Sequence, residues 1–152
     1  ASDTTMHDRS SELSWLPRLQ NAMRNNEFTL YVQPIRHLEK QESRAGDSLS
    51  DTDTQHYEFL LRLKNPDGSV STPWQFIQAA ERYDLMRDID RWVIRESLRR
   101  LGNAPDMPPL AVNISGRSFD DPALPQFIAE QLAVRPFFQC ITGCCFNQHD
   151  AR

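Results

Sequence analysis

The run from His56 to Leu63 places a carboxylate and a guanidinium inside an otherwise apolar segment. Side chains in a β-strand alternate between two faces, so Glu58, Leu60 and Arg62 should share one face, and the side chains between them should share the other. Burying an unpaired charge is costly, so such a strand needs an internal ion pair, a wet face, a metal or a charged ligand. The pattern leaves these alternatives open, but it makes this segment the best indication of function in the chain.

The composition is typical of a soluble globular domain. The 152 residues suffice for one sizeable core, and 39% of them are hydrophobic and 25% charged. The formal net charge of −4 and the lack of a basic cluster argue against a nucleic-acid partner. No apolar stretch is long enough to span a bilayer, and the polar N-terminus lacks the core of a signal peptide. We therefore expect a cytoplasmic domain without a membrane span.

The cysteines Cys140, Cys144 and Cys145 lie near the end of the chain, with His149 close behind. Three thiolates and an imidazole can in principle bind zinc. However, adjacent cysteines in a short tail cannot easily all reach one tetrahedral centre, and the paired C-x₂-C spacing of zinc sites is missing. The odd number of cysteines also argues against a complete disulfide framework. The sequence therefore favours a tail without a metal role.

Hydrophobic periodicity and turn signals predict an alternation of strands and helices. The predicted helices cover about 11–25, 73–82, 85–101 and 122–134, and the predicted strands cover 28–35, 56–63 and 110–115. Residues 1–10 are polar and are expected to be disordered, and residues 36–55 are expected to form a long surface loop. Strands that alternate with helices in this order are typical of an α/β protein built from βα units.

Polar side chains lie near the ends of the predicted strands. Gln33 is close to the end of the first strand, and Asn113 is close to the end of the strand 110–115. Ligands of parallel α/β sheets bind at the carboxyl ends of the strands, so these residues should share one rim with Glu58 and Arg62. Carboxylate and amide oxygens suit Mg²⁺ or Mn²⁺, and an arginine suits a phosphate. Together they predict phosphoester recognition, although each residue alone also fits a purely structural role.

The chain resembles the EAL domain family, bacterial phosphodiesterases that linearise cyclic di-GMP on a modified (β/α)8 barrel. The matching stretches are Leu30–Ile35, Tyr57–Leu63, Pro73–Tyr83, Ile89–Val93 and Val112–Gly116. The signature tripeptide reads Glu58-Phe59-Leu60, with phenylalanine in place of the usual alanine; this central side chain should point away from the ligand face. The resemblance implies an α/β fold, namely an incomplete (β/α)8 TIM-barrel-like EAL domain that covers roughly the first three strands and their helices.

The resemblance also implies roles for individual residues. Glu58 and Asn113 are similar to the family's metal ligands, with Mg²⁺ or Mn²⁺ as the expected cofactor. Arg62 resembles the arginine that contacts a phosphate of cyclic di-GMP. Gln33 is similar to a glutamine near a guanine or phosphate, and Leu60 of the signature tripeptide is counted with these substrate-binding residues. Cyclic di-GMP is therefore the expected small-molecule partner.

A domain organisation follows from the same resemblance. Residues 1–10 would be a disordered N-terminus, and residues 11–26 a linker helix of the kind that joins a GGDEF domain to an EAL domain. Residues 27–134 would form a truncated EAL domain. Residues 135–152 would be a tail that fits no family motif.

The match covers about half of the roughly 250 residues that a complete barrel needs. The family's later Glu-x-x-Glu and Asp-Asp-Phe-Gly motifs are missing, and Asp120-Asp121 precedes Pro122 at a predicted helix start. Glu81 and Asp90 fall in predicted helices and are expected to be structural. We therefore expect no complete catalytic set and negligible hydrolysis by this chain alone.

Two alternatives to a phosphodiesterase fragment remain open. The first is a non-catalytic EAL remnant that binds cyclic di-GMP or regulates a partner protein. An open barrel edge and uncovered apolar surface would favour a homo-oligomer, or pairing with another EAL or GGDEF protein. The second is a degraded gene product without a selected role.

Overall fold

The structure is a computed structural model that describes residues 4–36, 54–104, 106–134 and 146–147. The helices are α1 (Thr4–Arg24), α2 (Pro73–Arg82), α3 (Met86–Gly102), α4 (Gly116–Phe119) and α5 (Leu124–Ala133). The strands are β1 (Phe28–Arg36), β2 (Thr54–Lys64), β3 (Val70–Ser71), β4 (Leu110–Asn113) and β5 (Phe146–Asn147). This order of strands and helices confirms the predicted α/β class.

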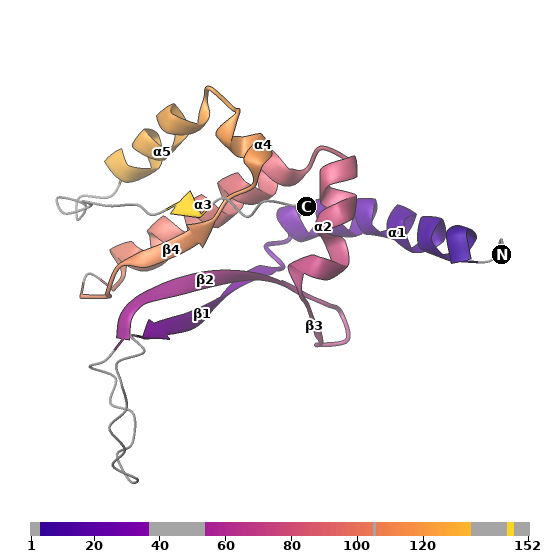
Figure 1. Ribbon diagram of the computed structural model, residues 1–152, viewed down its shortest axis with the longest axis horizontal. Helices are drawn as coiled ribbons and strands as arrows, with labels where there is room; N and C mark the ends of the chain where they lie inside the picture. The colour runs from indigo at the N-terminus through magenta and orange to yellow at the C-terminus, as the bar shows by residue number, and fades with distance from the viewer. Residues whose placement is uncertain (1–3, 37–53, 105, 135–145, 148–152) are drawn as a thin grey trace, which may run out of the picture.

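The strands form one mixed sheet in the order β1-β2-β4-β5, with β3 beside β2 (Figure 1). β4 runs parallel to β2 and β5 runs parallel to β4, but β1 and β2 are antiparallel. The expectation that the first two strands meet at their carboxyl ends, as in a parallel sheet, is therefore wrong. A parallel pair needs a crossover, usually a helix, whereas the sequence between β1 and β2 has no apolar helical pattern.

The two faces of β2 differ as the alternation of its side chains predicts. Phe59 is 2% exposed and Leu63 is 0% exposed, and both face the helices. Glu58, Leu60 and Arg62 are half-buried on the opposite face. Figure 1 shows the helices gathered on one side of the ribbon that β1 and β2 form. The face that carries the charged residues is therefore the one without a helical cover in the described part of the chain.

The main core lies between this sheet and the helices α1, α2 and α3. Its aromatic centre is Phe28 of β1, whose ring centroid lies 6.1 Å from that of Phe76 and 5.4 Å from that of Trp92. Its buried members are Leu19, Ala22, Phe28, Leu30, Phe59, Leu63, Phe76, Ala79, Ala80, Leu85, Met86, Ile89 and Val93. A smaller cluster joins Ile94, Leu98, Ile114 and Leu124, so α3 holds both clusters together.

Local signals explain where several elements begin and end. α2 starts at Pro73, as predicted, because proline is tolerated at the first helical position. The backbone nitrogen of Thr72 donates to Oε1 of Gln75 at 2.8 Å, and this hydrogen bond caps the N-terminus of α2. The sequence Asn65-Pro66-Asp67-Gly68 is a strong turn signal. The chain does turn there after β2, and Gly68 has a φ of +83°, which favours glycine.

Other element boundaries differ from the predictions. α1 begins at Thr4, so residues 4–10 are helical where disorder was expected over residues 1–10. Residues 1–3 lie outside the described residues. Once a helix is nucleated, each added residue costs little, which accounts for this extension. The short elements β3 and α4 were not predicted, because two and four residues are too few to show a periodicity.

Candidate functional site

Glu58 and Asn113, the two predicted metal ligands, lie side by side. β2 and β4 pair with Glu58 opposite Ala111, so Asn113 projects from the same face two residues further along β4. The amide nitrogen Nδ2 of Asn113 donates a hydrogen bond to Oε1 of Glu58 at 2.6 Å. Both side chains are half-buried. One carboxylate and one amide therefore converge on a single position beside the sheet.

The predicted substrate-binding residues lie on the same face. Gln33 of β1 is opposite Glu58 and is exposed, and Leu60 is opposite Tyr31. Directly opposite residues of an antiparallel pair have Cβ atoms about 4.5–5.5 Å apart. The Arg62 guanidinium carbon lies 5.5 Å from the centroid of the Tyr31 ring. We call this surface the open sheet face; it consists of Tyr31, Gln33, Glu58, Leu60, Arg62, Ala111 and Asn113.

Arg62 and Glu58 do not neutralise each other. Within the described residues neither side chain forms an ion pair, so Glu58 and Arg62 do not make an internal salt bridge with each other. Arg62 instead donates to the carbonyl oxygen of Leu61 at 2.7 Å and lies near the ring of Tyr31. The guanidinium keeps further donors that can bind an anion, because it has five N–H groups.

Asp90 of α3 supports the turn that follows Asn113. The carboxylate accepts a hydrogen bond from the backbone nitrogen of Ser115 at 3.1 Å and one from the hydroxyl of Ser118 at 2.6 Å. Burial raises the pKa of Asp90, while the hydrogen bonds from the two serines act in the opposite direction. The sequence predicts Asp90 to lie in a helix but gives no sign of these contacts, because its partners lie far along the chain.

Asp121 also makes structural contacts. Its carboxylate accepts a hydrogen bond from the backbone nitrogen of Ala123 at 3.0 Å, just before α5, and pairs with Arg91 at 2.9 Å. These contacts, chiefly the hydrogen bond from Ala123, lower the pKa of Asp121. Asp121 therefore lies just before a helix, as predicted, but α5 begins at Leu124 and Asp120 caps the end of α4.

The Glu58–Asn113 pair fits one hydrated divalent cation. Rotation of the Asn113 amide exchanges Nδ2 and Oδ1, and an amide oxygen would then face the same position as the Glu58 carboxylate. Mg²⁺ usually keeps several waters and uses one or two carboxylates together with phosphate oxygens. The part of the chain that the structure describes contains no group of three or more His, Cys, Asp or Glu side chains that could hold a metal. Cys140, Cys144, Cys145 and His149 lie outside it.

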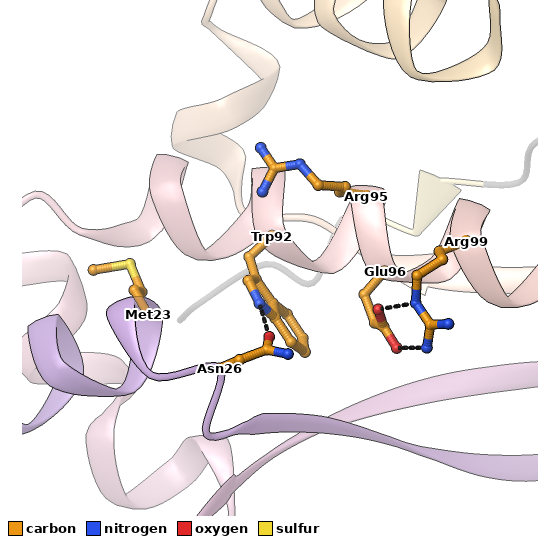
Figure 2. A pocket seen from close by; sticks show the side chains of 6 residues that line it. All are labelled: Met23, Asn26, Trp92, Arg95, Glu96 and Arg99. Carbon is orange, nitrogen blue, oxygen red and sulfur yellow. Dashed lines mark hydrogen bonds and ion pairs between the residues drawn. The ribbon is translucent and has the colours of Figure 1, made fainter. Parts of the chain in front are cut away.

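A separate pocket of about 340 Å³ lies in the helical layer (Figure 2). Its lining residues come from the end of α1, the turn after it, and α3: Met23, Asn26, Trp92, Arg95, Glu96 and Arg99. The Trp92 indole nitrogen donates to Oδ1 of Asn26 at 3.2 Å, and Arg99 binds Glu96 through two hydrogen bonds of 2.7 Å. None of the predicted site residues lines this pocket, so it is distinct from the open sheet face.

Comparison with known proteins decides the family. The sequence model of the EAL domain family matches residues 17–140. The chain belongs to the EAL domain family. The match extends to residue 140, beyond the expected end of the EAL segment at residue 134. The predicted fold class is confirmed too, since the structural neighbours of this EAL chain are EAL domains with a TIM-barrel-like fold, of which it covers a part.

Curated relatives include cyclic di-GMP phosphodiesterases. The EAL chain is 36% identical over 137 residues to cyclic di-GMP phosphodiesterase PdeB of Shewanella oneidensis, and the alignment covers 88% of this chain and 14% of that protein. It is 30% identical over 125 residues to cyclic di-GMP phosphodiesterase PdeF of Escherichia coli, which covers 80% of this chain and 15% of that protein. The EAL chain therefore spans only a small part of these relatives.

Solved EAL domains show the same arrangement. The EAL domain of Xanthomonas citri FimX in complex with c-diGMP has a TM-score of 0.65 and 31% identity, and the match covers 88% of this chain and 47% of that one. The EAL domain of Pseudomonas aeruginosa FimX bound to c-di-GMP has a TM-score of 0.65 and 33% identity, with coverages of 80% and 45%. This EAL chain spans just under half of both. None of its described helices has the length and apolarity to cross a bilayer.

Proposed function

We propose that this EAL chain forms part of a cyclic di-GMP phosphodiesterase site. Glu58 and Asn113 hold Mg²⁺ or Mn²⁺, and Arg62, Gln33 and Leu60 bind the dinucleotide. The observation that carries the proposal is the 2.6 Å contact between Asn113 and Glu58 on the face that also bears Arg62. The names of the relatives, and the c-di-GMP in the two FimX structures, support the choice of substrate.

Five residues of the open sheet face have roles that suit their chemistry. The guanidinium of Arg62 donates to a phosphate oxygen, and the amide of Gln33 hydrogen-bonds to a guanine edge or phosphate. Leu60 supplies an apolar contact for a base or sugar. When bound, a divalent cation polarises the phosphoester and lowers the pKa of a coordinated water. The negative charge of Glu58 and the oxygen of Asn113 place that cation beside Arg62.

We propose that the 152-residue chain alone binds the nucleotide but hydrolyses it negligibly. Glu58 and Asn113 are the cation ligands that the described residues provide on this face, and two side chains are too few to hold two cations. Each missing preorganised contact lowers the rate by about 10²–10³-fold. A second set of carboxylates would be needed for turnover.

We also propose a division of the chain into a linker helix over residues 11–26 and an EAL segment over 27–134, with 135–152 as a tail. The C-terminal part of α1 belongs to the core through Leu19 and Ala22, while its N-terminal end projects away from the other elements (Figure 1). A helix held at one end in this way suits a connection to another domain, such as a GGDEF domain.

Calorimetry with cyclic di-GMP tests the proposal. The chain should bind the nucleotide in the presence of Mn²⁺, and chelation of the metal should weaken binding at least about tenfold, because a cation shared with the phosphate is lost. Glu58→Gln should have the same effect, whereas the matched control Glu81→Gln on α2 should bind like the parent. Equal binding by Glu58→Gln and the parent would contradict the metal role. Linear product whose formation stops in Glu58→Ala would contradict the proposed inactivity.

A non-catalytic binding or interaction module is the second candidate. The exposed ring of Tyr31 beside Arg62 favours it, because an aromatic and a guanidinium together can bind a base or a peptide without a metal. Nucleotide binding that is unchanged by chelation and by Glu58→Gln, but lost in Arg62→Ala, would select this alternative.

A further inference from the structure

One buried carboxylate lies outside the proposed site but beside the turn that supports it. Asp90 of α3 is 3% exposed. Its oxygen Oδ2 accepts hydrogen bonds from the backbone nitrogen of Ser115 at 3.1 Å, from the hydroxyl of Ser115, and from the hydroxyl of Ser118 at 2.6 Å. Among the described residues, no lysine or arginine pairs with Asp90. These serine donors therefore compensate a charge that would be costly to bury.

All three donors belong to the segment that follows Asn113. β4 ends at Asn113, Ser115 is the residue before α4, and Ser118 lies within α4. A serine before a helix usually accepts a hydrogen bond from a backbone N–H of the first turn. The Ser115 side chain makes no such bond, and its hydroxyl donates to Asp90 instead. The Ser115 side chain therefore bonds the turn to α3 and does not cap α4.

A second contact holds the same turn from the apolar side. Ile114 is buried in the cluster that contains Ile94 and Leu98 of α3. Within β4, Val112 packs against both core clusters, so the next strand residue, Asn113, points to the open sheet face. Buried Ile114 and the bonds to Asp90 then anchor the backbone immediately after Asn113. Figure 1 shows β4 leading into α4 beside α3.

We propose that Asp90 is a positioning residue for Asn113. By binding Ser115 and Ser118 from α3, Asp90 fixes the backbone from which the Asn113 amide meets Glu58. The inference rests on the proposed function in so far as the Glu58–Asn113 pair holds a cation. It adds to that site a residue that touches neither the cation nor the nucleotide. Replacement of residues that orient metal ligands typically weakens metal binding by about 10–100-fold.

The side-chain amide signal of Asn113 in NMR spectra of the full chain tests this role without cation or nucleotide. Loss of one side-chain amide signal in Asn113→Ser assigns it. In the parent chain, Glu58→Gln should shift the signal, because Glu58 is the acceptor of this amide. In Asp90→Asn the Asn113 signal should differ from its position in the parent chain. Adding Glu58→Gln to Asp90→Asn should shift the signal no further. Asp90→Asn should also bind Mn²⁺ about 10–100-fold more weakly than the parent. The control Ile89→Val, a buried neighbour on α3, should lower the melting temperature without moving the signal.

The outcomes separate this inference from the proposed function. An Asn113 signal that in Asp90→Asn keeps its parent position and its response to Glu58→Gln would overturn the inference. If Asp90→Asn does not fold, Ser118→Ala removes one donor but keeps the carboxylate; a smaller shift in the same direction supports the inference, and no shift overturns it. If the signal behaves as expected but the parent chain binds neither Mn²⁺ nor cyclic di-GMP, the positioning role is supported and the proposed function is contradicted.

Discussion

Asn113 lies 55 residues after Glu58 in the sequence, yet its amide nitrogen is 2.6 Å from Oε1 of that glutamate. The parallel pairing of β4 with β2 brings the two side chains to one face. On the other side of β2, antiparallel pairing sets Gln33 opposite Glu58. Three strands therefore assemble one carboxylate and two amides. A shift of either pairing by one residue would send these side chains to opposite faces.

The two faces of β2 should differ sharply in their contribution to stability. Leu63 is fully buried among the helices, so Leu63→Ala should lower the free energy of unfolding by about 2–5 kcal/mol. Leu60→Ala is the matched control on the open sheet face of the same strand, and it should cost less than about 1 kcal/mol because less apolar surface is lost from water. Urea unfolding followed by circular dichroism measures both values. Equal losses would contradict the assignment of the two faces.

Arg62 should contribute to nucleotide binding without contributing to metal binding. Arg62→Lys keeps the charge but removes the planar fork that can bind a phosphate through two hydrogen bonds. We expect the affinity for cyclic di-GMP to fall by about tenfold, because a hydrogen bond to a charged group is worth about 1.5–3 kcal/mol and lysine retains part of it. The affinity for Mn²⁺ should stay at the parent value.

Calorimetric titrations with each ligand check this separation. Arg24→Lys is the control, because Arg24 lies at the exposed end of α1 and hydrogen-bonds to Asn21 at 2.7 Å. It should bind cyclic di-GMP like the parent. Parent-like binding by Arg62→Lys would argue against a bidentate phosphate contact.

Glu96 should stabilise the fold in a pH-dependent way. The carboxylate accepts hydrogen bonds from Arg99 and Arg100, and these bonds, above all that from Arg99, lower its pKa from 4.5 to about 2. A carboxyl group whose pKa is lower in the folded state stabilises the fold above its unfolded pKa, and this contribution is lost as the pH falls through the folded value. Glu96→Gln should therefore cost about 1 kcal/mol at neutral pH, reduced by solvent screening. The difference should shrink between pH 4.5 and about 2.

Urea unfolding at neutral and acidic pH measures this effect. Glu130→Gln on α5 is the control, because Glu130 accepts a hydrogen bond from Gln126 and forms no ion pair with the described residues. It should change the free energy of unfolding by less than about 0.5 kcal/mol. A cost of Glu96→Gln that grows as the pH falls would have the wrong sign for the proposed ion pairs.

The open sheet face should promote association. Tyr31 is 48% exposed there, and uncovered aromatic surface favours contact with another chain. We predict that the chain forms a homo-oligomer, or pairs with another EAL or GGDEF protein, through this face and the neighbouring strand edge. The weight-average mass from sedimentation should rise with concentration in the parent and less in Tyr31→Lys. Trp74→Lys removes an 82% exposed aromatic from α2 and should associate like the parent. A monomer at every concentration would contradict the homo-oligomer.

Sequence patterns predicted the local elements well. The start of α2 at Pro73, the turn at Gly68 and the two faces of β2 are all confirmed, because each depends on capping, backbone or alternation preferences within a few residues. The same patterns selected Glu58 and Asn113, whose metal role stays a prediction although the structure brings them together.

Other features could not be predicted from local patterns. The antiparallel pairing of β1 with β2 depends on how the chain returns between them. The contact of Asp90 with Ser115 and Ser118 joins α3 to the turn after β4, and no spacing rule connects these positions. The extra length of α1 before residue 11 likewise follows from extension of an established helix and not from an apolar pattern.

By itself, the sequence determined the main helices and strands and which side chains share a strand face, since these properties arise from interactions between near neighbours. Only the tertiary structure decided that β1 runs antiparallel to β2 and that Asn113 contacts Glu58. It also decided that Asp90 supports the turn between β4 and α4. These contacts join residues far apart in the chain. Their geometry is set by the burial of Phe28, Phe59 and Ile114 against the helices, and not by the local preference of any one residue.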